Sequence, residues 1–389
     1  MNALNEKALL WPDDSEAQLT LLQSAPVEST SYLQDQIITY IGNKRSLLPF
    51  IGKALEVAKS RLGKPKLRLL DLFSGSGVVA RYFKQHAEWL ACNDLEDYSR
   101  IANQCYLSNR SEIDMPTLRE ALESTRERIA QAWQPGFISE LYAPKNEQHI
   151  QAGERVFYSP RNALYLDTAR RAIGELPVAQ QYLLLAPLIA KASVHANTSG
   201  VFKGFYKSAE GIGQFGGSGR DALSRILAPI ELCLPLFSRF ECPVEVLQGD
   251  AASIVKDLPP IDVAYLDPPY NQHPYGSNYF MLNLLANYQR PVDVSTVSGI
   301  PMGWNRSRYN QRQQAADALF EVVHECKARF VLISYNSEGF IAKDTFLQRL
   351  GNFGSVTTME TSYNTFRGSR NLANRPMHVS EYLYLLEKK

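Results

Sequence analysis

The sequence predicts an α/β fold in which one sheet of βαβ units is interrupted by a long, mostly helical insertion. Three observations predict it. Residues 67–83 read as a strand, a glycine-containing loop and a helix in succession, and a second strand follows at 89–92. Short apolar runs return after residue 240, whereas the segment from about 115 to 240 has mostly helical patterns. Alternation of strand and helix is typical of a parallel sheet with right-handed crossovers.

Length and composition describe an ordinary soluble protein. The 389 residues suit one large domain with an insertion, or two domains. Apolar residues make up 45% and charged residues 21%. There is neither an apolar run long enough for a membrane helix nor an export signal, so we expect a cytoplasmic protein without membrane contact. A net charge of +1 argues against a uniformly basic binder but allows one local basic face.

The five cysteines show no C-x-x-C spacing. Neither a zinc cluster nor a disulfide framework is indicated, and we expect no metal site.

The N-terminal part of the chain leads from a polar segment into the first strand. Residues 1–35 are polar and weakly patterned, and we interpret them as an extension or flexible arm. From 39 to 62 a loop precedes an amphipathic helix. Its predicted apolar side consists of Leu47, Leu48, Ile51, Leu55 and Val57. The strand at 67–73 and the loop at 74–77 come next.

The rest of the chain completes the sheet. Within the insertion, helices are predicted at 117–133 and 162–176, and a glycine-rich loop covers 197–220. The apolar run around residues 182–190 is short and contains a proline, so it is interpreted as core. Further predicted strands and a final β-rich region cover 244–247, 261–266, 329–334 and 355–386.

The stretch "DLFSGSGVVA" is typical of a nucleoside-cofactor loop. Gly75 and Gly77 follow a strand and precede a helix, so backbone N–H groups can approach a ligand closely. Asp94 ends the next strand, where a carboxylate can accept hydrogen bonds from ribose hydroxyls. The pattern fits a dinucleotide equally well, and a tight turn without ligand is the alternative. Asp71 opens the loop and favours S-adenosylmethionine, whose ammonium group would meet a carboxylate.

The stretch "YLDPPYNQHPYGSNYF" predicts a site for an aromatic amine. Asp267 and the carbonyl of Pro268 are two acceptors at the end of a strand, and Pro269 stiffens them. Tyr270 adds a flat face on which a ring could stack. Two acceptors suit an exocyclic NH2 group, and with a methyl donor beside it the pair predicts an amino methyltransferase. A rigid proline turn that closes the strand is the alternative.

Four motifs, in this order, resemble the Dam-like, alpha-class N6-adenine DNA methyltransferases. They are "ITYIGNKRSLLPFI" from Ile38, "DLFSGSG" from Asp71, "NDLEDYS" from Asn93, and "DPPY" from Asp267. The resemblance covers the chain from about residue 36 to its end. It implies a Rossmann-like methyltransferase sheet from 36–115 and 241–389, with an inserted, mainly helical target-recognition domain at 116–240.

The resemblance also implies roles for individual residues. The N-terminal cofactor motif corresponds to Tyr40, Gly42, Asn43 and Lys44, with Tyr40 where the best-known members have Trp. The methionine-side loop corresponds to Phe73, Gly75 and Gly77, and the ribose-binding acid to Asp94. Asp250 matches the acid that reads the cofactor adenine. The catalytic motif is Asp267, Pro268, Pro269 and Tyr270, against which a flipped adenine would stack.

Three loops are candidates for contact with double-stranded DNA, because they combine cations with glycine, asparagine and aromatic residues. They contribute Lys203 and Lys207, then Arg306 and Arg308, and finally Arg367, Arg370 and Arg375. Solvated surface loops are the alternative. His273 could touch DNA or pack, and His195 is predicted to be a core or helix-capping residue.

Several alternatives remain beside adenine-N6 methylation of duplex DNA by S-adenosylmethionine. Cytosine-N4 methylation uses the same chemistry, although Asp267 favours adenine. RNA adenine and a free glutamine amide are other amine targets. A nicotinamide dehydrogenase could share the glycine loop but has no use for Asp267-Pro-Pro-Tyr, and an inactive DNA-binding protein would not need Tyr270. A cognate restriction endonuclease would be a functional partner without a stable complex, and the sequence sets no oligomeric state.

Overall fold

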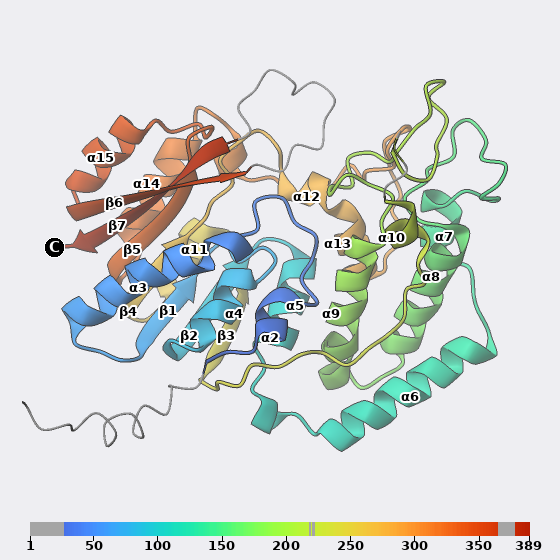
Figure 1. Ribbon diagram of the computed structural model, residues 1–389, viewed down its shortest axis with the longest axis horizontal. Helices are drawn as coiled ribbons and strands as arrows, with labels where there is room; N and C mark the ends of the chain where they lie inside the picture. The colour runs from blue at the N-terminus through green and yellow to red at the C-terminus, as the bar shows by residue number, and fades with distance from the viewer. Residues whose placement is uncertain (1–26, 218, 220–221, 365–377) are drawn as a thin grey trace, which may run out of the picture.

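A seven-stranded sheet forms the centre of the computed structural model, which describes residues 27–217, 219, 222–364 and 378–389. The strand order is β3-β2-β1-β4-β5-β7-β6 (Figure 1). The strands are β1 (Leu67–Asp71), β2 (Ala87–Asp94), β3 (Val244–Gln248), β4 (Ile261–Leu266), β5 (Ala328–Asn336), β6 (Gly354–Asn364) and β7 (His378–Lys388). The predicted α/β sheet is confirmed.

The parallel arrangement predicted for the sheet holds only for β1 to β5. Strand β7 runs antiparallel to both β5 and β6. The prediction of a parallel sheet is therefore wrong at this edge, because the chain reverses between two strands that follow each other in sequence instead of crossing over.

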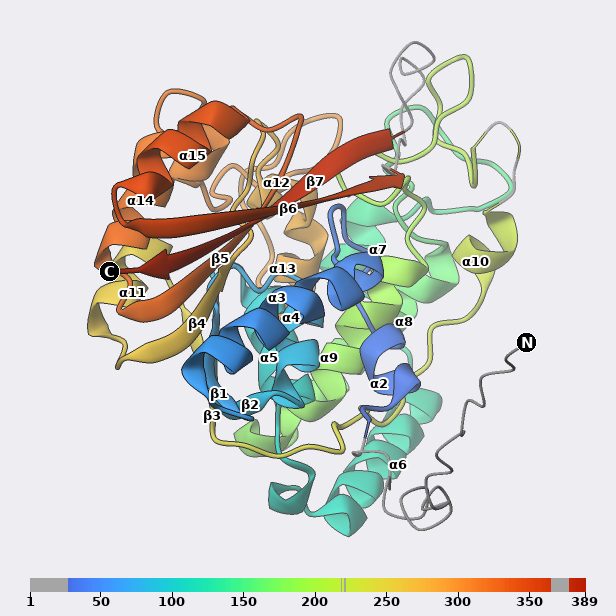
Figure 2. The same ribbon diagram turned by 60° about the vertical axis from the view of Figure 1, so that its left-hand side comes forward.

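Helices cover both faces of the sheet. On one face lie α3 (Leu48–Leu62) and α4 (Val78–Lys84); on the other lie α11 (Ala251–Asp257), α14 (Ala315–Glu325) and α15 (Lys343–Gly351) (Figure 2). Successive residues of β1 alternate between the two cores, since Leu69 packs in the first and Leu70 in the second. Burial on both faces explains why these strands are almost continuously apolar.

The chain between β2 and β3 is mainly helical and stands beside the sheet (Figure 1). It contains α5 (Asp97–Tyr106), α6 (Met115–Gln131), α7 (Phe137–Tyr142), α8 (Pro160–Gly174), α9 (Val178–Val194) and α10 (Leu223–Leu227). Helices α6 to α9 share one hydrophobic cluster with α5 and with α13 (Phe280–Asn287), which follows α12 (Tyr275–Asn278). Residues 116–240 therefore do not have a core separate from α5 and α13, and their role in target recognition stays a prediction.

Helix α9 is the apolar run that was predicted to be core. Its residues from Leu183 to Ala190 are buried, with Pro187 inside the helix. The helix ends at Val194, and His195 caps it as predicted, because its backbone N–H donates a hydrogen bond to the Lys191 carbonyl; its ring Nδ1 lies 2.7 Å from the carbonyl oxygen of Arg225. In the described ranges, none of the helices combines the length and hydropathy that crossing a membrane requires.

Part of the predicted N-terminal extension is packed. Residues 27–35 include α2 (Thr30–Gln34), and the Tyr32 side chain is 1% exposed. The buried guanidinium of Arg81 on α4 donates hydrogen bonds to the carbonyls of Tyr32 and Asp35. Residues 27–35 are therefore not a flexible arm, although weak apolar patterning gave no sign of the buried Tyr32 ring; the domain boundary at residue 35 stays a prediction. Val57, predicted on the apolar side of α3, is 37% exposed.

The strand order reverses between β1 and β4. From β1 the chain proceeds outward to β2 and β3, then returns to β4 on the other side of β1. The loops after two neighbouring parallel strands then diverge and leave a crevice at their carboxyl ends, where ligands of open α/β sheets bind. Both sequence motifs, at Asp71 and Asp267, lie at this crevice.

Candidate active site

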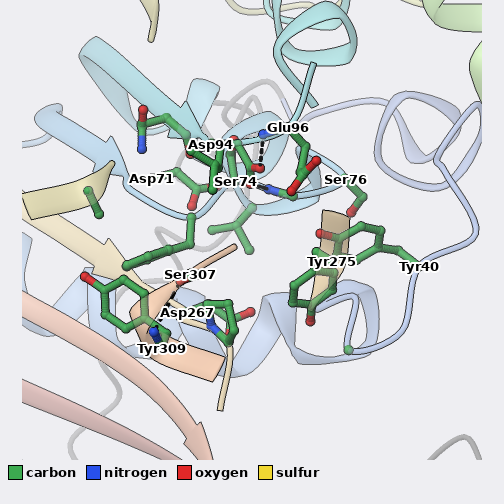
Figure 3. Close-up of a pocket in the computed structure, with 18 of the residues that line it drawn as sticks. Tyr40, Asp71, Ser74, Ser76, Asp94, Glu96, Asp267, Tyr275, Ser307 and Tyr309 are labelled. Atoms are coloured by element: carbon green, nitrogen blue, oxygen red, sulfur yellow. Dashed lines mark hydrogen bonds between the residues drawn. The ribbon is translucent and has the colours of Figure 1, made fainter. Parts of the chain in front are cut away.

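A cavity that is partly open to solvent occupies the crevice (Figure 3). The structure brings most of the predicted site residues together in its wall: Tyr40, Gly42, Asn43, Lys44, Asp71, Phe73, Gly75, Asp94, Asp250, Asp267 and Pro269. Gly77, Pro268 and Tyr270 are not among the lining residues.

The two glycines of the first loop serve different contacts. Both have positive φ, +50° at Gly75 and +77° at Gly77. A Cβ atom on Gly75 would lie 3.0 Å from the ring of Tyr40, and one on Gly77 would lie 2.6 Å from Oδ1 of Asn103. Gly75 therefore lets the N-terminal loop approach the cavity, whereas Gly77 lets α4 begin against α5.

Asp94 joins the loops after β1 and β2. Its Oδ2 accepts a hydrogen bond from the Gly75 amide at 2.7 Å, and its Oδ1 accepts one from the Glu96 amide at 3.0 Å. A carboxylate has about four acceptor positions, so Asp94 can accept further hydrogen bonds from a ligand.

Asp71 is a buried carboxylate that lacks a partner. Its side chain is 1% exposed, and neither oxygen has a hydrogen-bond partner of good geometry in the described part of the chain. Burial raises the pKa of Asp71 well above its usual value, and the carboxylates of Asp267 and Asp94 raise it further. The nearby amides of Phe73 and Ala80 act in the opposite direction without forming full hydrogen bonds. A cationic ligand group would supply what Asp71 lacks.

The cavity as a whole is acidic. Five carboxylates line it, and among its lining residues Lys44 is the one lysine or arginine. The carboxylates are Asp71, Asp94, Glu96, Asp250 and Asp267. Such a wall favours a ligand with positive charge and disfavours a pyrophosphate.

Lys44 bridges two carboxylates. Its Nζ lies 3.1 Å from Oδ1 of Asp267 and 3.0 Å from Oε1 of Glu381, and its side chain is 3% exposed. Burial alone lowers the pKa of Lys44, but the two carboxylates outweigh burial, so the pKa lies well above its usual value. The sequence assigned Lys44 to the cofactor motif, and the structure also ties it to the carboxylate of the Asp-Pro-Pro-Tyr segment.

The Asp267 carboxylate is more basic than an ordinary aspartate. Burial raises its pKa, the Lys44 ammonium lowers it and Glu381 raises it, and the result is about 6. A shared lysine therefore does not compensate fully for burial and for a second carboxylate.

Aromatic residues hold the N-terminal loop on the segment that follows the proline motif. The Tyr40 ring stacks on Tyr275 and Tyr279, with centroid distances of 4.9 and 4.6 Å. The Tyr279 hydroxyl accepts a hydrogen bond from the Ile41 amide at 2.7 Å. Tyr270 lies edge-on to Tyr335 at 5.8 Å. Tyr40 therefore stacks on aromatic side chains of the protein itself.

Sequence reasoning missed several residues of the wall. Glu96 lines the cavity and accepts hydrogen bonds from Asn283 and Asn305; burial, followed by the nearby Asp94, raises its pKa to about 7. The only sign of Glu96 in the sequence was its position within the motif "NDLEDYS". The loop at 303–312 was assigned to DNA, yet its side chains between and beside the arginines line the cavity: Asn305, Ser307, Tyr309 and Asn310. The alternation of asparagine, serine and tyrosine with arginine was a signal for this two-sided loop.

The predicted DNA-contact residues differ in their surroundings. Nζ of Lys203 lies 3.3 Å from Nδ1 of His273, and Lys207 lies over the ring of Phe205. The Arg306 guanidinium lies 4.8 Å from the centre of the Trp304 ring. The Arg308 guanidinium forms an ion pair with Glu321 at 2.7 Å, near η3 (Arg308–Asn310). Arg367, Arg370 and Arg375 lie outside the described residues.

Comparison with known proteins decides the class of reaction. Residues 40–341 match the model of the D12 class N6 adenine-specific DNA methyltransferase family, which is most of the chain and includes both motif loops. This chain belongs to that family. The D12-class enzyme is therefore an adenine-specific DNA methyltransferase, as the motif order predicted, and the dehydrogenase and cytosine-N4 alternatives are not favoured.

Curated relatives of this D12-class enzyme are modification methylases. It is 28% identical over 362 residues to Type II methyltransferase M.NlaIII of Neisseria lactamica, with 90% of this chain and 99% of that protein covered. It is 26% identical to Type II methyltransferase M.CviAII of Paramecium bursaria Chlorella virus 1, with 90% and 98% covered. The modification methylase StsI of Streptococcus sanguinis is 27% identical over 376 residues, which cover 90% of this chain and 52% of that protein.

Among solved structures, a Thermoplasma acidophilum protein is similar at a TM-score of 0.32 and 9% identity, with 92% and 94% of the two chains covered. That likeness is too weak to carry an argument about the site.

Proposed function

We propose that the acidic cavity binds S-adenosylmethionine and that the enzyme methylates N6 of an adenine flipped out of duplex DNA. The cofactor assignment rests on the buried carboxylate of Asp71, which has no hydrogen-bond partner of good geometry among the residues that the structure describes. S-adenosylmethionine has an ammonium and a sulfonium group and no pyrophosphate, so its charge is complementary to the five carboxylates of the wall.

Each part of the cavity wall suits one part of the cofactor. Asp71 would bind the methionine ammonium, and Asp94 would accept hydrogen bonds from the ribose hydroxyls. Asp250 caps α11 through hydrogen bonds from the Ala252 and Ser253 amides and would accept one from the cofactor adenine. Phe73 and Tyr309 pack edge to face at 5.0 Å and give this end an apolar wall. When bound there, the cofactor supplies an electrophilic methyl group.

The target amine would be held at the end of β4. Asp267 and the Pro268 carbonyl offer two acceptors for the two N–H groups of the adenine amine, and Tyr270 offers a ring for stacking. The acceptors favour the pyramidal nitrogen whose lone pair attacks, so the residues act by positioning and electrostatics. Lys44 would fix the direction of the Asp267 carboxylate.

The DNA would cross the rim beside this corner. Lys203, from the glycine-rich loop of the insertion, meets His273 three residues after Tyr270, so a cation of the insertion lies next to the catalytic motif. This contact supports the interpretation of residues 116–240 as a target-recognition region and of the 203–207 loop as a phosphate contact. We extend the proposal to Lys207, Arg306 and Arg308, and to the arginines at 367, 370 and 375 on sequence grounds alone. The modification methylases among the relatives support a role in restriction–modification.

Asp71→Asn should weaken S-adenosylmethionine binding roughly 10- to 100-fold, because a hydrogen bond to a charged group contributes about 1.5–3 kcal/mol. The same substitution should raise the free energy of unfolding of the free protein at neutral pH. The pKa of Asp71 is higher in the folded state than in the unfolded state, so the folded state binds the proton more tightly. The wild-type protein therefore loses stability as pH rises above the pKa that Asp71 has in the unfolded state. Calorimetric titration and thermal unfolding measure the two effects. Asp257→Asn, at the far end of α11, is the charge-matched control. Unchanged affinity would remove Asp71 from the cofactor site.

Asp267→Ala should reduce methyl transfer to duplex DNA roughly 100- to 1,000-fold, the scale for loss of one preorganised polar group at a reacting centre. Lys44 keeps Glu381 as its partner, so the fold and cofactor binding should survive. Transfer of labelled methyl from S-adenosylmethionine measures the rate, and digestion of the DNA identifies the modified base. Near-wild-type turnover, or a label on cytosine, would contradict the proposal.

The value of kcat/KM should fall as pH decreases through about 6. The pKa of Asp267 is raised from its usual value to about 6, so the carboxylate needed as acceptor is lost below that pH. A rate profile between pH 5 and about 8, with the fold checked at each pH by circular dichroism, measures it. A rate that stays constant down to about pH 5, as expected for an aspartate with the usual pKa of about 4, would show that Asp267 is not the group required in its ionised form.

Lys203→Ala should lower the slope of log K against log salt for DNA binding by about 1, because each phosphate contact contributes about 0.9. Lys256→Ala is the matched control, since this exposed lysine lies in the last turn of α11, at the end away from the cavity. Equal slopes for both variants would remove the 203–207 loop from the DNA interface.

A further inference from the structure

Three charges from distant parts of the chain, two of them buried and that of Asp267 partly buried, meet at the catalytic motif. Lys44 comes from the N-terminal loop, Asp267 follows β4, and Glu381 lies on β7. The Lys44 ammonium lies 3.1 Å from one carboxylate and 3.0 Å from the other. Their side chains are 3%, 18% and 1% exposed, respectively. No motif of the sequence pointed to Glu381.

The sheet itself fixes Glu381. Strand β7 lies between β5 and β6, and Glu381 pairs with Asn336 of β5 and with Thr361 of β6. The hydroxyl of Ser334, also on β5, donates a short hydrogen bond to the same Oε1 that meets Lys44. Because both a hydroxyl and an ammonium contact this oxygen, the Glu381 carboxylate is fixed in place and does not move if Asp267 moves.

The charges of the cluster do not balance. Two carboxylates and one ammonium sum to one negative charge, so the Lys44 ammonium is attracted to both Asp267 and Glu381. If Glu381 were neutral, the Lys44 ammonium could move closer to Asp267 and take up more of the positions at which that carboxylate accepts hydrogen bonds. With Glu381 ionised, some acceptor positions of the Asp267 carboxylate stay available to a ligand in the cavity.

We propose that Glu381 is a positioning residue for methyl transfer: it holds Lys44 from the side opposite Asp267 and so keeps the Asp267 carboxylate directed at the target amine. The inference rests on the proposed role of Asp267 as the acceptor for that amine. Glu381 itself is not among the residues that line the cavity, so it acts through Lys44.

The surrounding titratable groups set the direction of the pH effect. Asp267 faces Lys44 and Glu381, with Asp71 on β1 and the hydroxyl of Tyr265 on β4 close by. The Tyr270 hydroxyl interacts with Lys44 as well. Glu381 contributes to the raised pKa of Asp267, and the other groups stay in place when it is neutralised. In Glu381→Gln the acidic limb of kcat/KM should therefore move to lower pH than in the wild type.

The test compares Glu381→Gln with Glu387→Gln in the full-length protein, with S-adenosylmethionine and duplex DNA as substrates. Glu387 lies six residues further along the same strand and pairs with the partly exposed Arg61 and Arg329 instead of Lys44. For Glu381→Gln we expect kcat to fall roughly 10- to 100-fold, the scale of a misplacement of about 1 Å, with the KM values for both substrates nearly unchanged. The control should keep the wild-type kcat and acidic limb.

The outcomes separate this inference from the proposed function. If Glu381→Gln keeps the wild-type kcat and acidic limb while Asp267→Ala is inactive, Glu381 has no positioning role and the assignment of Asp267 stands. If Asp267→Ala is active, the proposed function fails first. If Glu381→Gln does not fold, Ser334→Ala preserves all three charges and loosens Glu381; we expect it to lower kcat at unchanged KM, and a wild-type kcat would overturn the inference.

Discussion

Parallel pairing of β1 with β4 is the constraint on which the site depends. Register pairs from Leu69 with Val263 to Asp71 with Tyr265 end both strands at the same edge, so two aspartates meet where the strand order reverses. Burial and the neighbouring Asp267 carboxylate raise the pKa of Asp71, and bringing carboxylates together in a buried crevice costs folding free energy. The fold accepts that cost at the place where a cationic ligand and an aromatic amine would bind.

The two aspartates are compensated differently. Asp267 shares the Lys44 ammonium with Glu381, whereas Asp71 is buried without a hydrogen-bond partner among the described residues. Lys44 thus accompanies Asp267, the carboxylate proposed to hold the target amine. Asp71, the carboxylate proposed to hold the cofactor, has no such cation and could pair with the positive charge of the cofactor. With the proposed roles of the two aspartates, this difference would suit the two halves of one acidic cavity to different ligands.

The site is assembled from segments that are far apart in sequence. The N-terminal loop is fastened by stacking of Tyr40 on Tyr275 and Tyr279, which come shortly after the proline motif. The antiparallel β7 brings Glu381 behind Lys44. Because three regions meet at one carboxylate, changes in the N-terminal loop or at the C-terminal edge of the sheet can act on methyl transfer through the position of Asp267.

By itself the sequence determined the α/β sheet, the loops that carry Asp71, Asp94 and Asp267, and the family. These features rest on local patterns: apolar periodicity, glycines where φ is positive, and acceptors directly after a strand. Only the tertiary structure decided the antiparallel β7, the inward side of the loop at 303–312 and the sharing of Lys44 with Glu381. Those features depend on contacts between residues that are tens to hundreds of positions apart, which no local pattern records.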